Sequence, residues 1–287
     1  MTIIILGSSG FVGKALVSKL SENGVKSKNM VRYKKNLKKN EFFGDITKEK
    51  FLEGKISDND TIINLIGQTN KKTSNLFDEN IIGTFNLLNL VKKKKNIKII
   101  FASSTTIYGE NSKKAAKESD EIYPTTDYQI VKSIAENIYQ TYSKTYGINV
   151  IVLRFSNIYG PDKETGIIAN CLKSNKSNPI TIDHNGNQVR DFLFIDDAIQ
   201  GIINTIQTPL KGFNILNISS GRGIKIKEVL KLIENTLDKK ITVKFTSKSF
   251  DKKNLFAKNL RAKKFIKFNT KITLKQGLKL VYNKKIT

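Results

Sequence analysis

The sequence is poor in the residues that metal centres and histidine-based catalysis require. It contains one cysteine, Cys171, and one histidine, His184, among 287 residues. A single cysteine excludes an intramolecular disulfide framework and a multi-cysteine metal site. His184 lies in the turn-like stretch 183–187 (DHNGN), which favours a loop residue over a ligand or a general base. The sequence therefore predicts no metal site, and it argues against Ser-His-Asp chemistry.

Long hydrophobic runs are absent as well. No apolar stretch approaches the roughly 20 residues that a bilayer-spanning helix needs. The apolar run at 2–6 is too short for a signal peptide and ends in a glycine. We therefore expect no membrane span and a cytoplasmic protein.

Acidic residues are scarce beside basic ones. The chain has 25 Asp and Glu against 50 Lys and Arg, and its formal net charge is +25, which raises the question of nucleic acid. The lysines are spread along the chain, and the densest run, 92–95, ends a helix-like segment, where the helix dipole favours cations. This distribution favours a general compositional bias and no specific nucleic-acid partner. A basic surface also attracts phosphorylated small molecules. The charge alone does not distinguish compositional bias, nucleic-acid binding and the binding of such molecules.

A strand, a glycine turn and a helix are predicted at the start of the chain. Residues 2–6 (TIIIL) form an apolar run, and helical periodicity covers 11–20. Between them lie Gly7, Gly10 and Gly13, spaced three and three, which departs from the Gly-x-Gly-x-x-Gly form. Such glycines let the backbone approach a pyrophosphate, whose charge is favoured at a helix N-terminus. The expected dinucleotide contacts here are Gly7, Gly10, Phe11, Val12 and Gly13.

Strand and helix patterns continue to alternate further along the chain. Apolar runs at 61–66, 97–101 and 149–153 predict strands, and helical periodicity predicts helices at 76–91 and 128–146. Alternation of this kind implies a parallel sheet with helices on both faces and ligands at the strand ends.

We therefore predict an α/β protein with a Rossmann-type doubly wound parallel sheet over residues 1–160. A smaller mixed α/β substrate-binding part, interleaved with the first, is predicted over 161–287. The segments assigned to this part are 213–218, 226–237, 241–245 and a final helix at 274–281.

Tyr128 and Lys132 lie four residues apart in a predicted helix, and they therefore share one helix face. An ammonium beside a phenol can lower the pKa of the phenol and prepare it for proton transfer near neutral pH. Tyr-x-x-x-Lys alone also fits an amphipathic surface pair. The glycine turn upstream favours the catalytic interpretation.

Several further motifs follow the glycine turn in a fixed order. They are 44–46 (GDI), 80–84 (NIIGT), 103–109 (SSTTIYG), 154–161 (RFSNIYGP), 190–197 (RDFLFIDD) and 217–221 (NISSG). Over nearly its whole length the chain resembles the extended short-chain dehydrogenase/reductases that act on nucleotide sugars, known as NAD-dependent epimerase/dehydratases. Because dimers are usual in that family, the resemblance also implies a homodimer.

The resemblance implies roles for individual residues. Tyr128 is the expected acid and base at a sugar hydroxyl or keto oxygen, Ser104 would hydrogen-bond that oxygen, and Lys132 would hold the nicotinamide ribose. Asn157 and Arg190 would hold the diphosphate of a nucleotide-diphosphate sugar, for which a planar guanidinium is well suited. The remaining expected contacts are Asp45, Ile46 and Asn80 with the cofactor and Thr106 with the substrate.

One departure from the family pattern concerns the reaction. Members that dehydrate their sugar carry an Asp-Glu pair directly after the active-site Ser or Thr, because removing water needs an additional acid and base. Here those positions are Thr105 and Thr106. Dehydration is therefore not expected, nor is the decarboxylation in which related enzymes use a glutamate there.

A second departure concerns the cofactor. After the predicted strand 27–31, an acidic residue would accept the adenosine ribose hydroxyls of NAD. This chain has Arg32 there, followed by Lys34 and Lys35. A cation at this place can accept a 2′-phosphate. The expected cofactor is therefore NAD or NADP, and Arg32 favours NADP.

Together these features predict an NAD(P)-dependent nucleotide-sugar epimerase that transfers a hydride at a sugar carbon, and C4 is the favoured carbon. A one-way NADPH-dependent 4-ketoreductase is the alternative that Arg32 favours. A non-catalytic dinucleotide-binding or RNA-binding protein is a minor alternative, because a binding module has no need of a proton donor such as Tyr128.

Overall fold

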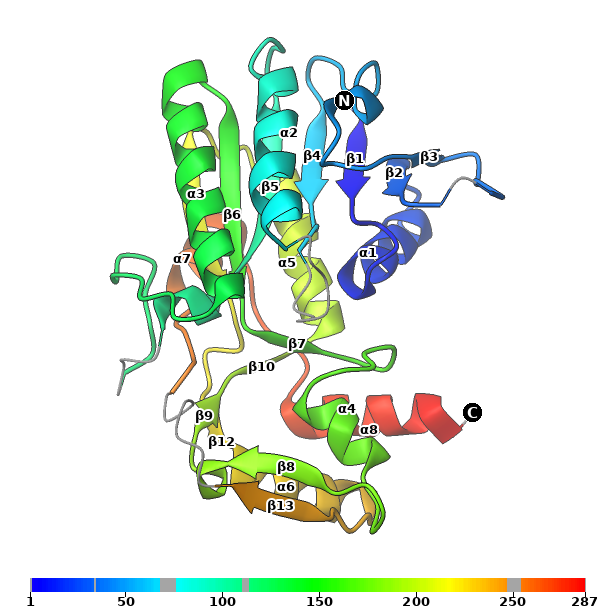
Figure 1. Ribbon diagram of the computed structural model, residues 1–287, viewed down its shortest axis with the longest axis vertical. Helices are drawn as coiled ribbons and strands as arrows, with labels where there is room; N and C mark the ends of the chain where they lie inside the picture. The colour runs from blue at the N-terminus through cyan, green and yellow to red at the C-terminus, as the bar shows by residue number, and fades with distance from the viewer. Residues whose placement is uncertain (1, 34, 68–75, 110–113, 247–253, 287) are drawn as a thin grey trace. The chain divides into compact units, whose positions relative to one another are not determined.

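The computed structural model describes residues 2–33, 35–67, 76–109, 114–246 and 254–286 (Figure 1). The chain divides into two compact units, each built from several segments. Unit 1 comprises Met1–Ile107, Pro124–Arg154 and Ile199–Leu216, and unit 2 comprises Tyr108–Tyr123, Phe155–Ala198 and Asn217–Thr287. The chain therefore passes repeatedly from one unit to the other. The domain boundary near residue 160 stays a prediction.

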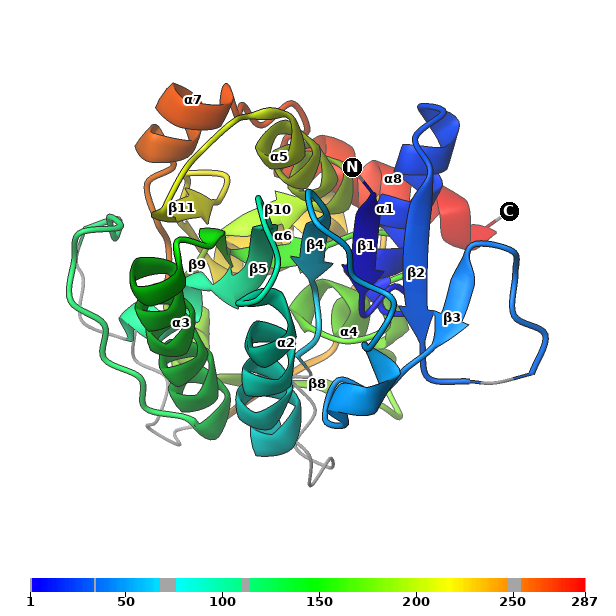
Figure 2. The same cartoon turned by 90° about the horizontal axis from the view of Figure 1, so that it is seen from above.

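Unit 1 is built on a seven-stranded sheet with the order β11-β6-β5-β4-β1-β2-β3 (Figures 1 and 2). β1 pairs in parallel with β2 and β4, β2 pairs with β3, and β4 pairs with β5. This is the Rossmann strand order with one strand added at an edge, and the order reverses between β1 and β4. The predicted Rossmann-type fold is confirmed. The strands are β1 (Ile3–Leu6), β2 (Ser27–Val31), β3 (Glu41–Phe43), β4 (Thr61–Asn64), β5 (Lys98–Ser104), β6 (Asn149–Phe155) and β11 (Phe213–Ile218).

Helices cover both faces of this sheet. In Figure 2, α2 and α3 lie on one face, and α1 and α5 lie on the other. Every residue of β1 and β4 is buried, as expected for central strands that are covered on both sides. The core under α2 and α3 includes Leu87, Tyr139 and Phe101, and the rings of the latter two lie 4.7 Å apart. The helices are α1 (Phe11–Glu22), α2 (Gly83–Val91), α3 (Asp127–Tyr146) and α5 (Ile195–Gln207).

Local signals fix the ends of α3, the helix that carries Tyr128 and Lys132. The Thr126 hydroxyl caps its start by accepting the N–H of Gln129, and Gly147 ends it in the left-handed conformation at φ +67°. Tyr128 consequently lies in the first turn of α3, and Lys132 lies one turn further along.

The helix predicted at 76–91 contains an irregular turn. A π-helical turn, Asp78–Ile82, precedes α2. Turns of this kind widen the helix locally and are frequent at functional sites. In this turn both Glu79 and Asn80 are buried.

One assignment from the sequence is wrong. Residues 213–218, predicted to belong to the smaller C-terminal part, form β11, the edge strand of the large sheet beside β6. The N–H of Val150 on β6 donates to the carbonyl oxygen of Gly212, just before β11, at 2.9 Å. An apolar strand pattern predicts the local conformation of a segment but not the strand with which it pairs. The segment pairs with β6 because the backbone groups at the outer edge of β6 need hydrogen-bond partners.

Unit 2 contains short strands in pairs, together with helices. β10 pairs in parallel with β7, β13 pairs in parallel with β8, and β12 pairs antiparallel with β9. The helix predicted at 274–281 is confirmed as α8, and the segment 226–237, whose type was not predicted, forms the helix α6. The strands are β7 (Asn157–Tyr159), β8 (Ile180–Asp183), β9 (Val189–Arg190), β10 (Phe192–Phe194), β12 (Ile224–Lys225) and β13 (Val243–Thr246). The helices are α4 (Ile167–Lys173), α6 (Ile226–Leu237), α7 (Leu260–Ile266) and α8 (Leu274–Ile286).

Candidate active site

The glycine turn after β1 leaves no room for a side chain at Gly13. Gly7 has φ of +83°, and a Cβ on Gly13 would lie only 2.2 Å from the Gly7 carbonyl oxygen. Gly10 is the N-cap of α1, and among the described residues no side chain caps this helix start. The predicted contacts Phe11 and Val12 are the first residues of α1, the helix that begins at this turn. This close backbone approach to a helix N-terminus fits the pyrophosphate of a dinucleotide.

Tyr128, the predicted proton-transfer residue, is described together with Ser104 and Thr106, which are predicted to contact the substrate. Ser104 ends β5, and its Oγ lies 2.9 Å from Oγ1 of Thr106 and accepts the Thr106 N–H at 3.2 Å. Removal from water raises the pKa of Tyr128 to about 12, and a hydrogen bond with Ser104 opposes that rise. Burial therefore sets the direction of the shift, which is opposite to the expected lowering of the phenol pKa. Near neutral pH the phenol carries its proton.

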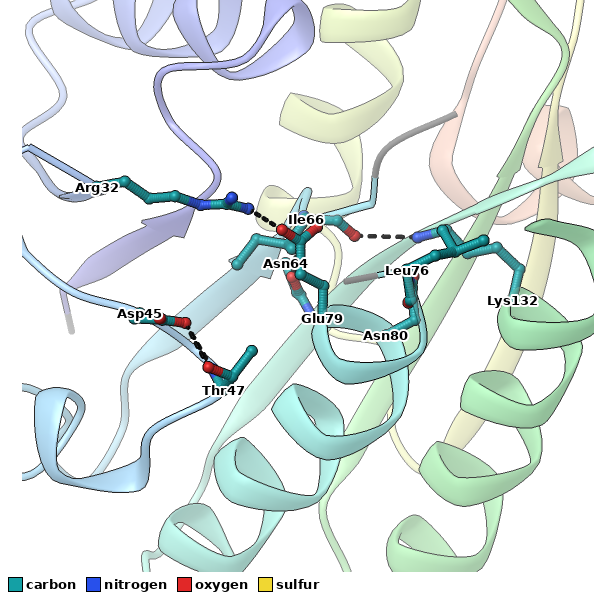
Figure 3. Close-up of polar contacts among 9 residues, drawn as sticks. All are labelled: Arg32, Asp45, Thr47, Asn64, Ile66, Leu76, Glu79, Asn80 and Lys132. Atoms are coloured by element: carbon teal, nitrogen blue, oxygen red, sulfur yellow. Dashed lines mark hydrogen bonds and ion pairs between the residues drawn. The ribbon is translucent and has the colours of Figure 1, made fainter. Parts of the chain in front are cut away.

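Lys132 is fixed at the ends of two neighbouring strands. Its Nζ donates to the carbonyl oxygen of Ile66 at 3.0 Å, as Figure 3 shows, and to that of Ala102 at 2.9 Å. Burial lowers the pKa of Lys132 to about 7, and the negative charges of Glu136 and Glu79 oppose that shift.

Gly67, which the sequence did not single out, makes room for this ammonium. Its φ is +152°, and a Cβ there would lie 2.4 Å from Nζ of Lys132. The space beside Lys132 therefore depends on a glycine, as the close packing at Gly13 does.

A buried ionic network lies on α3 one turn beyond Lys132. The carboxylate of Glu136 accepts two hydrogen bonds from Nε of Arg154, at 3.1 and 3.2 Å, and one from Nη2 at 2.6 Å. It also accepts the hydroxyl of Ser103, the neighbour of Ser104. Each side chain of the ion pair is only 4% exposed. This network joins α3 to β5 and β6, and it thereby holds together the elements that carry Ser104 and Lys132. Glu136 is not among the site residues predicted from the sequence.

The predicted cofactor contacts Asp45 and Asn80 are drawn in Figure 3, one shortly after β3 and one in the π-helical turn before α2. Oδ1 of Asp45 accepts the N–H and the hydroxyl of Thr47 at 3.0 and 2.8 Å, and Ile46 is buried. Nδ2 of Asn80 donates to the carbonyl oxygen of Leu76 at 2.8 Å. Oδ1 of Asn80 is buried and has no hydrogen-bond partner among the described residues. An unpartnered acceptor of this kind fits a ligand that brings its own donors.

Arg32 does not extend freely into solvent. Its guanidinium forms an ion pair with the carboxylate of Glu79, a contact that was not predicted from the sequence. Lys34, which strengthened the expectation of a 2′-phosphate site, lies outside the described residues.

The residues predicted to hold the substrate diphosphate lie together in unit 2. Asn157 is exposed on β7, and its Nδ2 donates to the carbonyl oxygen of Asp191 at 3.0 Å. Arg190 is half-buried on β9, and its Nη1 donates to the carbonyl oxygen of Val189 at 2.9 Å. Asn157 and Arg190 therefore flank the backbone of one buried residue, Asp191.

Asp191 is fully buried and organises this part of unit 2. Its carboxylate accepts the hydroxyl of Ser156 at 2.9 Å and the N–H groups of Ser220 and Gly221 at 2.9 and 3.0 Å. Burial raises the pKa of Asp191 to about 6, and these hydrogen bonds oppose the rise.

The described part of the chain offers neither a metal site nor a membrane span. No three His, Cys, Asp or Glu side chains there gather into a group that could hold a metal ion. None of the helices there combines the length and the apolar character that a bilayer crossing requires.

Comparison with known proteins identifies the family. Residues 3–219 match the NAD dependent epimerase/dehydratase family. The chain belongs to this family. A UDP-glucuronate 4-epimerase from Thermodesulfobacterium geofontis is 31% identical over 210 residues, which are 72% of this chain and 64% of the relative. The crystal structure of UDP-glucose 4-epimerase from Thermotoga maritima with UDP-glucose matches this chain with a TM-score of 0.86. The two sequences are 26% identical, and the match covers 100% of both chains. A dTDP-glucose 4,6-dehydratase from Bacillus anthracis in complex with NAD is 25% identical over 100% of this chain and 97% of that chain, with a TM-score of 0.88.

Membership of the NAD-dependent epimerase/dehydratase family confirms the resemblance on which the predicted enzyme class rested. It supports NAD as the cofactor type, and it shows no preference for NADP. The roles of Ser104, Tyr128, Lys132 and the other predicted site residues stay predictions.

Proposed function

We propose that this protein is a nucleotide-diphosphate-sugar 4-epimerase that oxidises C4 of the sugar with NAD and returns the hydride to the opposite face. The observation that carries the proposal is the group at the end of β5, where Ser104 and Thr106 hydrogen-bond each other and Tyr128 bonds with Ser104. Thr105 and Thr106 supply no carboxylate for the removal of water, and this favours epimerisation over dehydration.

Tyr128 is the proton-transfer residue of this proposal. With a pKa of about 12 the phenol is protonated near neutral pH, and it is ready to donate to a C4 keto oxygen. To accept a proton from the C4 hydroxyl, its pKa must fall, which positive charge nearby brings about. Lys132 is the nearest source of such charge on α3, and Ser104 would hold the sugar oxygen in line with the phenol. When bound, the oxidised nicotinamide supplies a positive charge and the acceptor for the hydride.

Asn157 and Arg190 are proposed to hold the substrate diphosphate. An amide and a planar guanidinium both donate to phosphate oxygens, and the guanidinium can do so through two parallel hydrogen bonds. The related 4-epimerases are named for UDP-glucose and UDP-glucuronate. UDP-linked hexoses are therefore the first substrates to test.

A one-way 4-ketoreductase is the second candidate, and Arg32 is the observation that favours it, because a cation after β2 can receive the 2′-phosphate of NADPH. The two reactions differ in their use of cofactor. An epimerase ends with the cofactor in its starting state, whereas a ketoreductase consumes one reduced nicotinamide for each product.

The test follows UDP-glucose, UDP-glucuronate and UDP-N-acetylglucosamine by proton NMR in D2O with a small amount of NAD. An epimerase converts one of them to an equilibrium mixture of C4 epimers. It introduces no deuterium at C4, because the same hydride returns, and no NADH accumulates. The proposal is wrong if none of them is epimerised while a 4-keto sugar is reduced at the expense of NADPH.

The cytoplasmic location and the homodimer expected from the sequence also stay proposals. Cell fractionation tests the first. Light scattering of the purified protein at several concentrations tests the second, and a molar mass of one chain at all of them contradicts the homodimer.

A further inference from the structure

The ion pair between Arg32 and Glu79 crosses the part of the site expected to bind adenosine. Arg32 directly follows β2, and Glu79 lies in the π-helical turn beside Asn80. In Figure 3 the guanidinium reaches from the end of β2 to the Glu79 carboxylate, beside Ile66 at the end of β4.

The two partners differ greatly in exposure. The side chain of Arg32 is 53% exposed, whereas that of Glu79 is 5% exposed. One carboxylate oxygen of Glu79, Oε1, receives Nη2 of Arg32. The other, Oε2, is buried and has no hydrogen-bond partner among the residues that the structure describes. A buried carboxylate depends strongly on its counter-charge, because an isolated buried charge is very unfavourable.

The ion pair with Glu79 limits the contacts that Arg32 can make with a cofactor. If the guanidinium turned to a 2′-phosphate, it would leave the Glu79 carboxylate buried without its partner. A 2′-phosphate beside Glu79 would also meet a like charge, which disfavours both. The same carboxylate suits the two hydroxyls of an unphosphorylated ribose, because a carboxylate only accepts hydrogen bonds and Oε2 has none.

We propose that Glu79 is a specificity-determining residue that makes the site select NAD over NADP. It neutralises Arg32, and its Oε2 supplies the acceptor for adenosine ribose hydroxyls that the end of β2 lacks. The acidic residue usual after the second strand is thus replaced by one from the turn before α2. The inference rests on the proposed function only in that the site binds a nicotinamide dinucleotide.

The experiment measures the affinities of NAD and NADP by calorimetry, without sugar substrate, for four proteins: the wild type, Glu79→Gln, Glu22→Gln and the double variant Glu79→Gln/Arg32→Gln. Glu22→Gln is the matched control. It removes one negative charge from an exposed ion pair with Lys19 on α1.

The wild type should bind NAD more tightly than NADP. Glu79→Gln releases the guanidinium, and one charge-assisted contact with the 2′-phosphate should raise the NADP affinity by about 10- to 100-fold. The NAD affinity should fall, because the amide is a weaker acceptor than the carboxylate. The double variant should lose the gain for NADP, and Glu22→Gln should change neither affinity.

Two results overturn the inference. One is a wild type that binds NADP more tightly than NAD, which needs no variant to fold. The other is a folded Glu79→Gln protein with the wild-type ratio of the two affinities. A wild type that binds neither dinucleotide overturns the proposed function as well, whereas tight NAD binding without epimerisation leaves the inference standing and overturns the proposed function alone.

Discussion

Replacing Glu136 by glutamine should destabilise unit 1 strongly. The substitution keeps the shape of the side chain but removes the charge that Nε and Nη2 of Arg154 contact at 2.6 to 3.2 Å. Arg154 is 4% exposed and cannot lose its proton, so it would stay buried with an uncompensated charge. Breaking a buried pair in this way costs about 3–5 kcal/mol. At about 2–4 °C per kcal/mol for a domain of this size, the melting temperature should fall by roughly 6–20 °C.

Differential scanning calorimetry of the wild type, Glu136→Gln and the exposed-pair control Glu22→Gln measures this effect. The control should melt like the wild type, because exposed ion pairs contribute little to stability. Glu136 also raises the pKa of Lys132, and the titration of that lysine should therefore move to lower pH in the variant. A Glu136→Gln protein that melts with the control would refute the argument that the charge of this network holds α3 to β5 and β6.

Three further predictions concern the proton donor, the space beside Lys132 and the buried aspartate of unit 2. Tyr128→Phe should lower turnover by roughly a hundredfold or more while NAD binding stays nearly intact, and near-normal turnover on the true substrate would remove Tyr128 from the mechanism. Gly67→Ala should weaken NAD binding by about 10- to 100-fold, since its Cβ would lie 2.4 Å from Nζ of Lys132 and displace a charge-assisted contact. Gly54→Ala is the control, because Gly54 also has positive φ but no atom within 4 Å of such a Cβ, and equal losses in both would contradict the claim. Burial raises the pKa of Asp191 from 3.8 to about 6, and the folded state therefore binds the proton more tightly than the unfolded state does. The contribution of Asp191 to the free energy of unfolding should consequently decrease as pH rises from about 4 through 6. Urea unfolding of the wild type and Asp191→Asn across that range should give a smaller pH dependence for the variant, and identical slopes would exclude Asp191 as the source.

The parts of the fold and site that the sequence predicted are those set by local patterns. The turn from Gly7 to Gly13 follows from residues adjacent in the chain, and the positions of Tyr128 and Lys132 follow from helical spacing. The sheet could be predicted because strands and helices alternate, which permits few topologies.

The parts that the sequence missed depend on partners far apart in the chain. Arg32 favoured a site for the 2′-phosphate of NADP only because its ion pair with Glu79, 47 residues away, cannot be predicted from the sequence. Glu136 was overlooked for the same reason, although its position four residues after Lys132 placed it on the same helix face. The pairing of β11 with β6 is likewise a long-range fact that no local pattern encodes.

The place of β11 at the edge of the sheet has a consequence for synthesis on the ribosome. β6 ends at Phe155 and β11 begins at Phe213, so the neighbour of β6 is made roughly 60 residues later, which takes about 3–12 s at ordinary elongation rates. During that interval the outer edge of β6 presents unpaired N–H and C=O groups, which are a template for pairing with another nascent chain. Chains that stall between these two strands should therefore be the most prone to aggregate and the most dependent on chaperones.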